Sequence, residues 1–399
     1  MSGLDKIFDS IGDRNLFKNK EILQLNYFPG RILHREKEIK HIGSILAPCL
    51  LGEKTSNVFA YGVTGTGKTL CVQHVADELK KRVEGSKILR IEYLNCKLKK
   101  VADTEYRIFA ELIKKFGGSV PETGLPTQEV YRRFLDFLEK NDEKLFILIL
   151  DEIDQAVKKI SDDFLYNLTR LNSELSNTQI IIIGISNDLR FLDRIDPRVR
   201  SSLSEEELVF PPYNALQLQD ILKKRAEGAF KPGVVSEGVI AKCAAFAARE
   251  HGDARRALDL LRVAGEIAGR EASSKIKIKH IDEANNKIEK DKILDIIETQ
   301  PKQFQLVLYS IFQLIKRTKG NIFTGDIYSY YQELCRKIKI EDLTQRRVSD
   351  ILAEFDMLGL INARVISKGR QGRTREIKLA IPENILRKSK EILGRSLGL

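Results

Sequence analysis

The feature that most constrains the fold is a segment that matches the phosphate-binding pattern GxxxxGK followed by Ser or Thr. Its residues are Gly62, Val63, Thr64, Gly65, Thr66, Gly67, Lys68 and Thr69. The apolar residues 58–61 predict a short strand before it, and a helical pattern begins at residue 69, which is the context that the motif requires. Glycines let the backbone wrap closely around phosphate oxygens, and the helix N-terminus adds a positive field.

The motif predicts how the phosphates of a nucleotide are held. We expect ATP or ADP to be bound by this loop together with Leu70, the residue that follows it. Lys68 is expected to reach the β- and γ-phosphates, and the Thr69 hydroxyl is expected to be a ligand of Mg²⁺. An ordinary glycine-rich turn is the alternative, which the flanking strand and helix disfavour.

Strand and helix patterns alternate from residue 21 to about residue 212. Apolar runs predict strands at 58–61, 88–95, 145–150 and 179–185. Helical patterns predict helices at 69–82, 104–116, 128–140 and 161–175. Apolar strands separated by helices are typical of a parallel sheet inside an α/β domain.

Two carboxylates, Asp151 and Glu152, directly follow the buried strand 145–150. Ligands bind at the carboxyl ends of strands in open α/β sheets, so we expect both beside the phosphates. Asp151 is predicted to bind Mg²⁺ through water, and Glu152 to orient and deprotonate the attacking water. An acidic pair is also common at the start of a helix, but the phosphate loop upstream favours a catalytic role. Asp154 is assigned a structural role.

A third polar residue, Asn187, follows the apolar strand 179–185. At the end of a strand beside the acidic strand, its amide can hold the lytic water or touch the γ-phosphate. A turn-forming Asn before Asp188 is an equally good interpretation.

After Pro211 and Pro212 the chain becomes helical. Helices are predicted at 216–229, 236–251, 254–272 and 279–289, as expected for a small helical domain without strands. The predicted organisation is a flexible N-terminal arm at 1–20, an α/β nucleotide-binding domain at 21–212, a helical domain at 213–298 and a C-terminal domain at 299–399.

The last quarter of the chain carries most of the positive charge. Residues 300–399 hold 19 Lys and Arg against 10 Asp and Glu, which is nine of the net eleven positive charges. This asymmetry fits a polyanion-binding domain or a solvated surface. Three helical patterns, at 304–317, 324–336 and 344–357, precede two β-rich segments at 361–367 and 374–380. That order predicts a winged helix, which favours DNA as the polyanion.

Two parts of this domain are expected to contact DNA. Thr344 is a plausible N-cap of the third helix, with Gln345, Arg346 and Arg347 exposed where a helix enters the major groove. Leu352, Phe355 and Leu358 are expected on its core face. The glycine-containing hairpin tip supplies further cations for phosphates or a minor groove: Lys368, Arg370, Arg373 and Arg375. A solubilising loop or a protein-contacting wing is the alternative.

Composition excludes several other classes of protein. The apolar runs are far shorter than the roughly 20 residues that span a bilayer, and the first 20 residues have no signal-peptide core. The five cysteines are widely spaced and include no CxxC pair, which disfavours a disulfide framework or zinc site. We expect a soluble cytoplasmic, nucleoid-associated protein without a membrane partner.

Taken together, these motifs resemble an AAA+ ATPase. More narrowly, the chain resembles the archaeal replication initiators related to the eukaryotic origin recognition complex and the cell-division-cycle loader protein. The resemblance extends from about residue 29 to the C-terminus. Besides the phosphate loop and the acidic pair, it rests on residues 29–31, 34–36, 184–187, 196–199, 210–213 and 252–258.

The resemblance implies further roles in the nucleotide site. Residues 29–35, with Pro29 and Arg31, look like the strip that covers adenine. Tyr213 and Arg225 match positions that contact the nucleotide from the lid boundary. Arg255 looks like the lid arginine that senses the γ-phosphate in cis, with a helix-surface salt bridge as its alternative.

Two further contacts are implied by the resemblance. Arg198 looks like the arginine offered to the γ-phosphate of a neighbouring subunit, with the nearby Arg194 and Arg200 as alternatives. An insertion at 97–118, with Lys99 and Lys100, matches one that touches DNA in this family, and a solvated helix face is the alternative.

The resemblance implies an ATP-dependent replication initiator. Such a protein binds double-stranded origin DNA, helps to recruit or load the replicative helicase, and uses slow ATP hydrolysis as a switch. Other copies or paralogues on the DNA are expected partners. A motor or clamp-loader subunit and a nucleotide-gated transcription regulator are the alternatives, of which the winged helix disfavours the clamp-loader subunit.

Overall fold

The computed structural model describes residues 15–97, 103–121, 123–141, 143–161, 163–203, 205–318, 322–367 and 373–399. It divides into two compact units, Met1–Ile281 and Asp282–Leu399, and each is described by itself. One helix, α12 (Ile278–Thr299), continues from the first unit into the second. The domain bounds expected from the sequence stay predictions. Among the described residues, no helix combines the length and apolar character needed to cross a bilayer.

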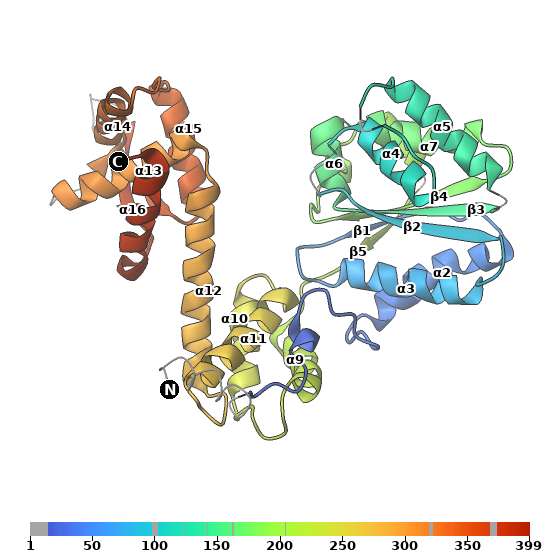
Figure 1. Ribbon diagram of the computed structural model, residues 1–399, viewed down its shortest axis with the longest axis horizontal. Coiled ribbons are helices and arrows are strands. Elements are labelled where there is room, and N and C mark those ends of the chain that lie inside the picture. Colours follow the sequence, from blue (N-terminus) through green and yellow to red (C-terminus); the bar gives the residue numbers. More distant parts are fainter. Residues whose placement is uncertain are drawn as a thin grey trace, which may run out of the picture. The chain divides into compact units, whose positions relative to one another are not determined.

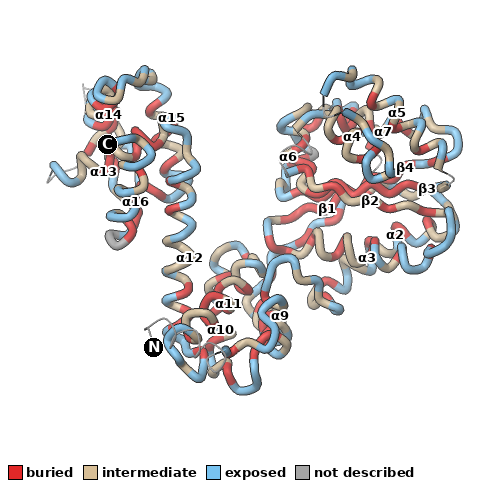
Figure 2. Tube along the Cα trace, viewed as in Figure 1, coloured by how far each residue is buried: buried red, intermediate tan, exposed pale blue. Residues whose placement is uncertain are grey.

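The first unit is built on a sheet of five parallel strands. They are β1 (Asn57–Tyr61), β2 (Leu89–Asn95), β3 (Leu145–Asp151), β4 (Gln179–Ser186) and β5 (Glu205–Val209). Their order is β2-β3-β4-β1-β5, and every pairing is parallel. Every residue of β3 is buried (Figure 2), because this strand lies between β2 and β4 in a sheet that is covered on both faces. The predicted parallel α/β domain is therefore confirmed.

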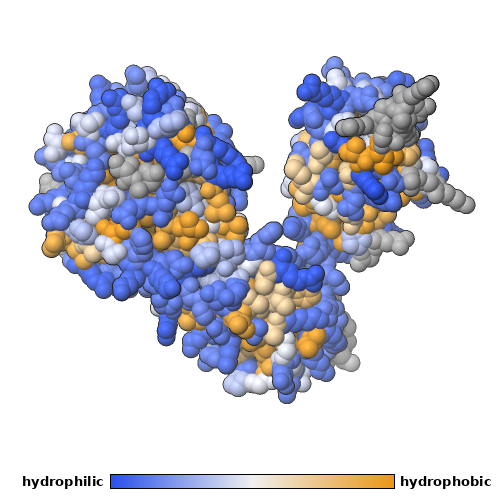
Figure 3. Space-filling view, turned by 180° about the vertical axis from the view of Figure 1, so that it is seen from behind, coloured by the Kyte–Doolittle hydropathy of each residue, from blue (hydrophilic) through white to orange (hydrophobic). Residues whose placement is uncertain are grey.

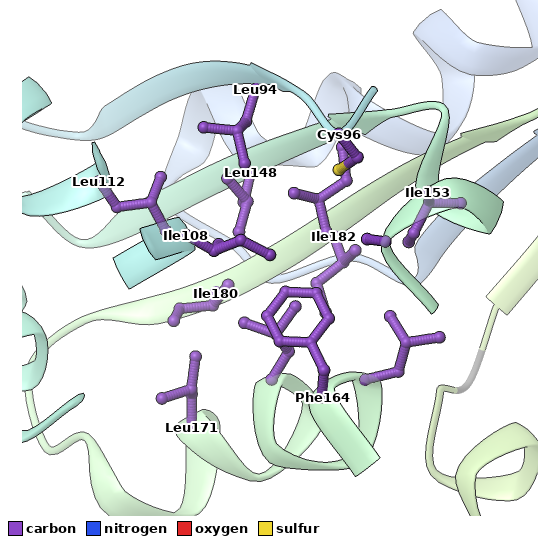
Figure 4. Packing of buried hydrophobic residues seen from close by; sticks show 14 of the residues in the cluster. Leu94, Cys96, Ile108, Leu112, Leu148, Ile153, Phe164, Leu171, Ile180 and Ile182 are labelled. Carbon is purple, nitrogen blue, oxygen red and sulfur yellow. The ribbon is translucent and has the colours of Figure 1, made fainter. Parts of the chain in front are cut away.

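Helices cover both faces of this sheet (Figure 1). One face carries α2 (Glu36–Leu46) and α3 (Lys68–Arg82). The other carries α4 (Glu105–Lys115), α5 (Thr127–Lys140), α6 (Ile153–Ile160) and α7 (Asp163–Glu174). On that second face, Leu148 and Ile182 of the sheet pack with Leu112 and Phe164 of the helices (Figure 4). The apolar strands thus hold the loops at their carboxyl ends on a rigid support.

A helical lid completes the first unit, with α9 (Ala215–Ala229), α10 (Val239–Arg249) and α11 (Ala254–Arg270). Part of the expected N-terminal arm packs on it. The Phe17 ring lies 4.8 Å from the Phe230 ring, the two residues form a β-bridge, and Lys18 N donates to Ala229 O. Residues 15–23 are therefore attached to the lid, and residues 1–14 lie outside the described residues.

The second unit is a winged helix, as predicted. Its elements are α13 (Lys302–Arg317), β6 (Ile322–Phe323), α14 (Thr324–Ile338), α15 (Gln345–Met357), β7 (Ile361–Ser367), β8 (Arg373–Leu379) and α16 (Glu383–Leu397). The three strands are antiparallel in the order β6-β8-β7. The rings of Phe304 and Phe355 meet edge to face within one core. The sequence analysis did not identify β6 and α16.

Some predicted elements were wrong in extent. The helix expected to end at residue 289 is α12, which continues to Thr299 because Leu294 and Ile297 extend its apolar face into the second core. It ends two residues before Pro301, which is a strong helix breaker. The helix predicted at 161–175 is α7, whereas α6 directly after the acidic pair was not predicted.

Candidate nucleotide site and DNA-binding surface

A cleft of about 490 Å³ in the first unit lies at the carboxyl ends of the strands. Its volume is within the range of small-molecule sites. Predicted site residues that line it are Pro29, Arg31, Gly65, Gly67, Lys68, Thr69, Leu70, Asp151, Glu152, Asn187, Tyr213, Arg225 and Arg255. The predicted residues Gly62, Val63, Thr64, Thr66 and Arg198 are not among its lining residues. The structure thus gathers most of the predicted nucleotide site into one cavity.

The phosphate loop has a backbone that needs glycine. Gly67 has a φ of +89° and stands at the N-terminus of α3. Gly65 has a φ of +77°, and a Cβ added there would lie 1.7 Å from Oδ1 of Asp253, the N-cap of lid helix α11. The start of the lid helix therefore lies so close to the phosphate loop that a side chain at position 65 would clash with Asp253.

Lys68 is buried and reaches across this loop. Its Nζ donates to Gly62 O at 2.8 Å, to Val63 O at 2.9 Å and to Asn187 Oδ1 at 2.9 Å. Burial lowers the pKa of Lys68 to about 8, and the carboxylate of Asp151 opposes this shift. Asn187 is thus held at the phosphate loop. The turn after β4 is closed by Ser186, whose hydroxyl oxygen accepts from Asp188 N.

Asp151 is oriented by three donors. Its Oδ2 accepts from the Thr69 hydroxyl at 2.9 Å and from the Tyr93 hydroxyl at 2.8 Å, and its Oδ1 accepts from Glu152 N at 2.9 Å. Burial, and secondly the Asp151 carboxylate, raise the pKa of Tyr93, so its phenol remains a donor. Sequence analysis missed Tyr93, which only the strand pairing of β2 with β3 brings near Asp151.

The oxygen ligands suit Mg²⁺. Thr69 and Asp151 bring a hydroxyl and a carboxylate to one point, and both are hard oxygen ligands. Within the described ranges, no group of three or more His, Cys, Asp or Glu side chains could hold a metal ion by itself. Mg²⁺ is usually held by one or two carboxylates and the phosphates of a substrate.

Glu152 lies beside Asp151 in a conformation that is rare for a residue with a side chain. Its φ is +54° where it precedes α6, and its carboxylate lies 3.5 Å from Lys97 Nζ. Such strained backbone often occurs at functional sites. Asp154 is buried and accepts from Gln155 and Ser186, which agrees with the structural role expected for it.

Side chains from the lid boundary hold the strip before α2. Arg225 donates to Ile22 O at 3.1 Å, and its guanidinium lies 4.6 Å from the centre of the Tyr27 ring. The Tyr213 ring lies 4.1 Å from the guanidinium of Arg35, a buried residue to which sequence analysis gave no role of its own. At the start of α11, Asp253 accepts from Arg255 N, and Arg255 lines the cleft.

The three arginines considered for a neighbouring subunit are all paired on the surface. Arg198 binds Asp196 through two hydrogen bonds of 3.1 and 3.0 Å, Arg194 binds Asp188, and Arg200 binds Glu207. The Arg198 side chain is 86% exposed, against 63% for Arg194 and 45% for Arg200. Arg198 is thus the most accessible to another molecule, and its role stays a prediction.

In the second unit, the start of α15 has the expected cap. Thr344 Oγ1 accepts from Arg347 N, and Gln345, Arg346 and Arg347 are exposed. Leu352 and Phe355 are buried as predicted, but Leu358 is 37% exposed because it follows the last helical residue, Met357.

The wing differs from its expected form at one arginine. Arg375 lies on β8, and its Nη1 donates to Ser349 O of α15 at 3.1 Å. Arg373 begins β8. Lys368, Arg370, Lys99 and Lys100 lie outside the described residues.

The surface of the second unit is mixed, with hydrophobic patches beside hydrophilic ones (Figure 3). Met357 and Val365 are among its exposed apolar residues.

Comparisons with known proteins match all three parts of the chain. Family models match an AAA domain at residues 53–192, a Cdc6 AAA+ ATPase-type lid domain at 219–286 and the CDC6 C-terminal winged helix domain at 295–389. The chain is 51% identical to the ORC1-type DNA replication protein of Pyrococcus abyssi, over 95% of this chain and 91% of the relative. It is 49% identical to ORC1-type DNA replication protein 1 of Methanosarcina acetivorans, over 96% and 93%.

Solved structures agree. The Aeropyrum pernix ORC1 protein in complex with DNA is 42% identical, with a TM-score of 0.84 over 96% of this chain and 97% of that one. Cdc6p from Pyrobaculum aerophilum is 19% identical, with a TM-score of 0.60 over 96% and 99%, and therefore shows a shared fold only.

Proposed function

The chain belongs to the ORC1/Cdc6-type archaeal DNA replication initiators, AAA+ proteins with a C-terminal winged helix, and from that membership we propose that it is an ATP-switched origin-binding protein. It binds double-stranded origin DNA and helps to recruit or load the replicative helicase. The observation that carries this proposal is the near full-length similarity to the Aeropyrum pernix ORC1 protein, which is solved with DNA.

ATP is proposed to occupy the cleft with its phosphates on the loop from Gly62 to Thr69. Lys68 supplies a positive charge from the loop, and Asn187 supports the lysine through its amide oxygen. The Thr69 hydroxyl and the Asp151 carboxylate would hold Mg²⁺, which would supply positive charge against the charge that develops during hydrolysis. Glu152 orients the attacking water and accepts its proton. Arg255 contacts the γ-phosphate from the lid.

Hydrolysis is proposed to be slow in a single chain. Arg198 is exposed and does not line the cleft of its own chain, so a neighbouring copy on DNA would have to supply it. Arginines supplied in this way accelerate other phosphoryl transfers by about 10³- to 10⁵-fold. Slow turnover suits a switch that persists while a partner is recruited.

The winged helix is proposed to read DNA. Arg346 and Gln345 stand at the exposed start of α15, where a helix in the major groove presents side chains to base edges. The wing would position the domain through phosphates or the minor groove.

Mapping of the bound sites tests this proposal against its alternatives. Chromatin immunoprecipitation in the source cell, followed by footprinting with the purified chain, should give a few strong sites at replication origins. Sites confined to promoters would indicate a transcription regulator instead. Binding without sequence preference, together with rapid turnover, would indicate a motor.

A further inference from the structure

Arg35 is a buried cation to which the nucleotide chemistry above assigns no task. It is 2% exposed, and its guanidinium bonds in three directions. Nε donates to Thr66 O at 2.9 Å, Nη1 to Glu38 Oε1 at 2.7 Å and Nη2 to Pro211 O at 2.5 Å. Burying a charge is unfavourable unless it is paired and hydrogen-bonded, and Arg35 meets both conditions.

The bond to Thr66 fixes the orientation of one peptide group in the phosphate loop. That peptide is trans, so the Thr66 carbonyl and the Gly67 N–H point in opposite directions. Arg35 holds the carbonyl on its own side and therefore directs the Gly67 N–H away from itself. Gly67 lines the cleft, and without a Cβ its backbone has wide conformational freedom. The hydrogen bond from Arg35 to Thr66 O restrains the orientation of this N–H.

The other contacts of Arg35 lead toward the lid. Pro211 and Tyr213 belong to the segment between β5 and α9, which connects the sheet to the lid. The Tyr213 ring stacks on the Arg35 guanidinium at 4.1 Å, and its hydroxyl lies 2.9 Å from the position that a Cβ on Gly67 would take. The phosphate loop and the connection to the lid are thus supported by the same side chain.

We propose that Arg35 is a positioning residue that presets the Thr66–Gly67 peptide for phosphate binding and links the phosphate loop to the lid connection. This inference rests on the proposed function in one respect, namely that the cleft binds a nucleotide. Replacing Arg35 should weaken binding of the phosphates, because the N–H that meets them would no longer be held in place.

The test compares Arg35→Met and Arg35→Lys with a matched variant, Arg90→Met. Arg90 also stacks on a ring, that of Phe116 at 4.0 Å, and also donates to a backbone carbonyl, that of Lys115 at 2.7 Å. It belongs to the same domain but does not line the cleft. Calorimetric titration of the full chain with ADP gives the affinity, at a temperature where circular dichroism shows each variant folded.

We expect Arg35→Met to weaken ADP binding by about tenfold, the scale of one lost hydrogen bond, and Arg90→Met to change it by less than about twofold. Arg35→Lys should recover part of the loss, because an ammonium can still reach one carbonyl but not all three acceptors. In steady-state hydrolysis, the KM for ATP should rise while kcat changes little. Amide hydrogen exchange of the ADP complex should show less protection of the phosphate loop in Arg35→Lys than in the unmodified chain.

Equal ADP affinity in Arg35→Met and Arg90→Met would overturn the inference, as would a fall in kcat at constant KM. If Arg35→Met does not fold, the affinity and exchange of Arg35→Lys decide in the same way. Failure of the unmodified chain to bind ADP would instead overturn the proposed nucleotide function, and this inference with it.

Discussion

The side-chain amine of Lys68 donates a hydrogen bond of 2.9 Å to the amide oxygen of Asn187, a residue 119 positions further along the chain. The two meet because β1 and β4 are parallel neighbours, with Tyr61 opposite Ser186 at their carboxyl ends. The phosphate loop follows β1 and Asn187 follows β4, so both begin at the same edge of the sheet. A cation and an amide are therefore held together where the last phosphate of ATP is expected.

We expect Glu152→Gln to bind ATP but not to hydrolyse it. The amide keeps the size of the side chain and leaves Asp151 and Thr69 in place, but it cannot accept the proton of the attacking water. ATP binding and phosphate release, measured on the same preparation, check this. Lys68→Ala serves as the contrast, because it should lose tight ATP binding altogether. Hydrolysis by Glu152→Gln at the unmodified rate would show that another group is the base.

Nucleotide binding should be accompanied by proton uptake near pH 8. With the pKa of Lys68 lowered to about 8 by burial, about half of the free protein has a neutral amine at that pH. Phosphates favour the charged amine, so binding should draw in up to about half a proton per site. Titration calorimetry in buffers of different ionisation enthalpy measures this number.

The same pKa fixes the sign of a stability effect. Between pH 8 and the ordinary value of 10.5, the unfolded chain holds more protons on Lys68 than the folded chain does. This group therefore makes the free protein more stable as the pH rises through that window.

Lys68→Arg is the control for the proton uptake on nucleotide binding, because a guanidinium stays charged at pH 8 and should abolish that uptake. Equal uptake in Lys68→Arg would assign the proton to another group.

Tyr93→Phe should weaken the apparent affinity of the site for Mg²⁺ in hydrolysis without changing the fold. The substitution removes one of the two hydroxyl donors to Asp151 Oδ2 and keeps the ring packed. Partners that orient a metal ligand typically contribute about 10- to 100-fold in metal affinity or activity. The Mg²⁺ concentration for half-maximal hydrolysis should rise accordingly. An unchanged Mg²⁺ profile would mean that Thr69 and Glu152 N suffice to orient the carboxylate.

Tyr93 also shows where sequence reasoning stops. The phosphate loop is local: eight consecutive residues, with a strand before and a helix after, determine its backbone, and the structure has it as expected. The Tyr93 hydroxyl meets Asp151 because β2 pairs with β3 in one register, with Asn95 opposite Asp151. No local pattern around residue 93 contains that information.

Arg35 was hidden for a similar reason. The resemblance placed it at the end of a strip over adenine, but two of its three acceptors are carbonyls of Thr66 and Pro211, distant in sequence. Backbone carbonyls carry no residue-type signal, so the contact appears only in the folded chain. Arg375 is the converse case: a basic hairpin suggested DNA, whereas its bond to Ser349 depends on how the wing packs against α15.

Complementation between inactive variants should reveal the arginine supplied in trans. Arg198→Ala keeps a complete cleft but offers no arginine, and Glu152→Gln offers the arginine but has no base. Arg198→Ala alone should hydrolyse ATP slowly and Glu152→Gln alone should not hydrolyse it. A mixture on DNA should recover activity, because one partner completes the site of the other. Arg194→Ala and Arg200→Ala in place of Arg198→Ala provide the controls. Full activity of dilute Arg198→Ala alone would exclude this role.

Salt dependence should separate three arginines of the winged helix. Arg346 is exposed at the start of α15, where it can pair with guanine, so Arg346→Ala should cost about 1 to 3 kcal/mol on the preferred site and less on scrambled DNA. Arg373, at the start of β8, is predicted to meet phosphate. Arg373→Ala should therefore weaken binding to all sequences and reduce the salt slope by about one.

Arg375 provides the sharper comparison, because its guanidinium is bonded to Ser349 O. If it holds the wing against α15 rather than a phosphate, Arg375→Ala should weaken binding to the preferred site and leave the salt slope unchanged, since no counterion is released at that residue. Binding isotherms at several salt concentrations, on preferred and scrambled duplexes, measure both quantities. A slope reduced by about one in Arg375→Ala would return this residue to the phosphate contacts predicted from the sequence. If none of the three substitutions changed the affinity, the basic surface would be assigned to protein docking instead.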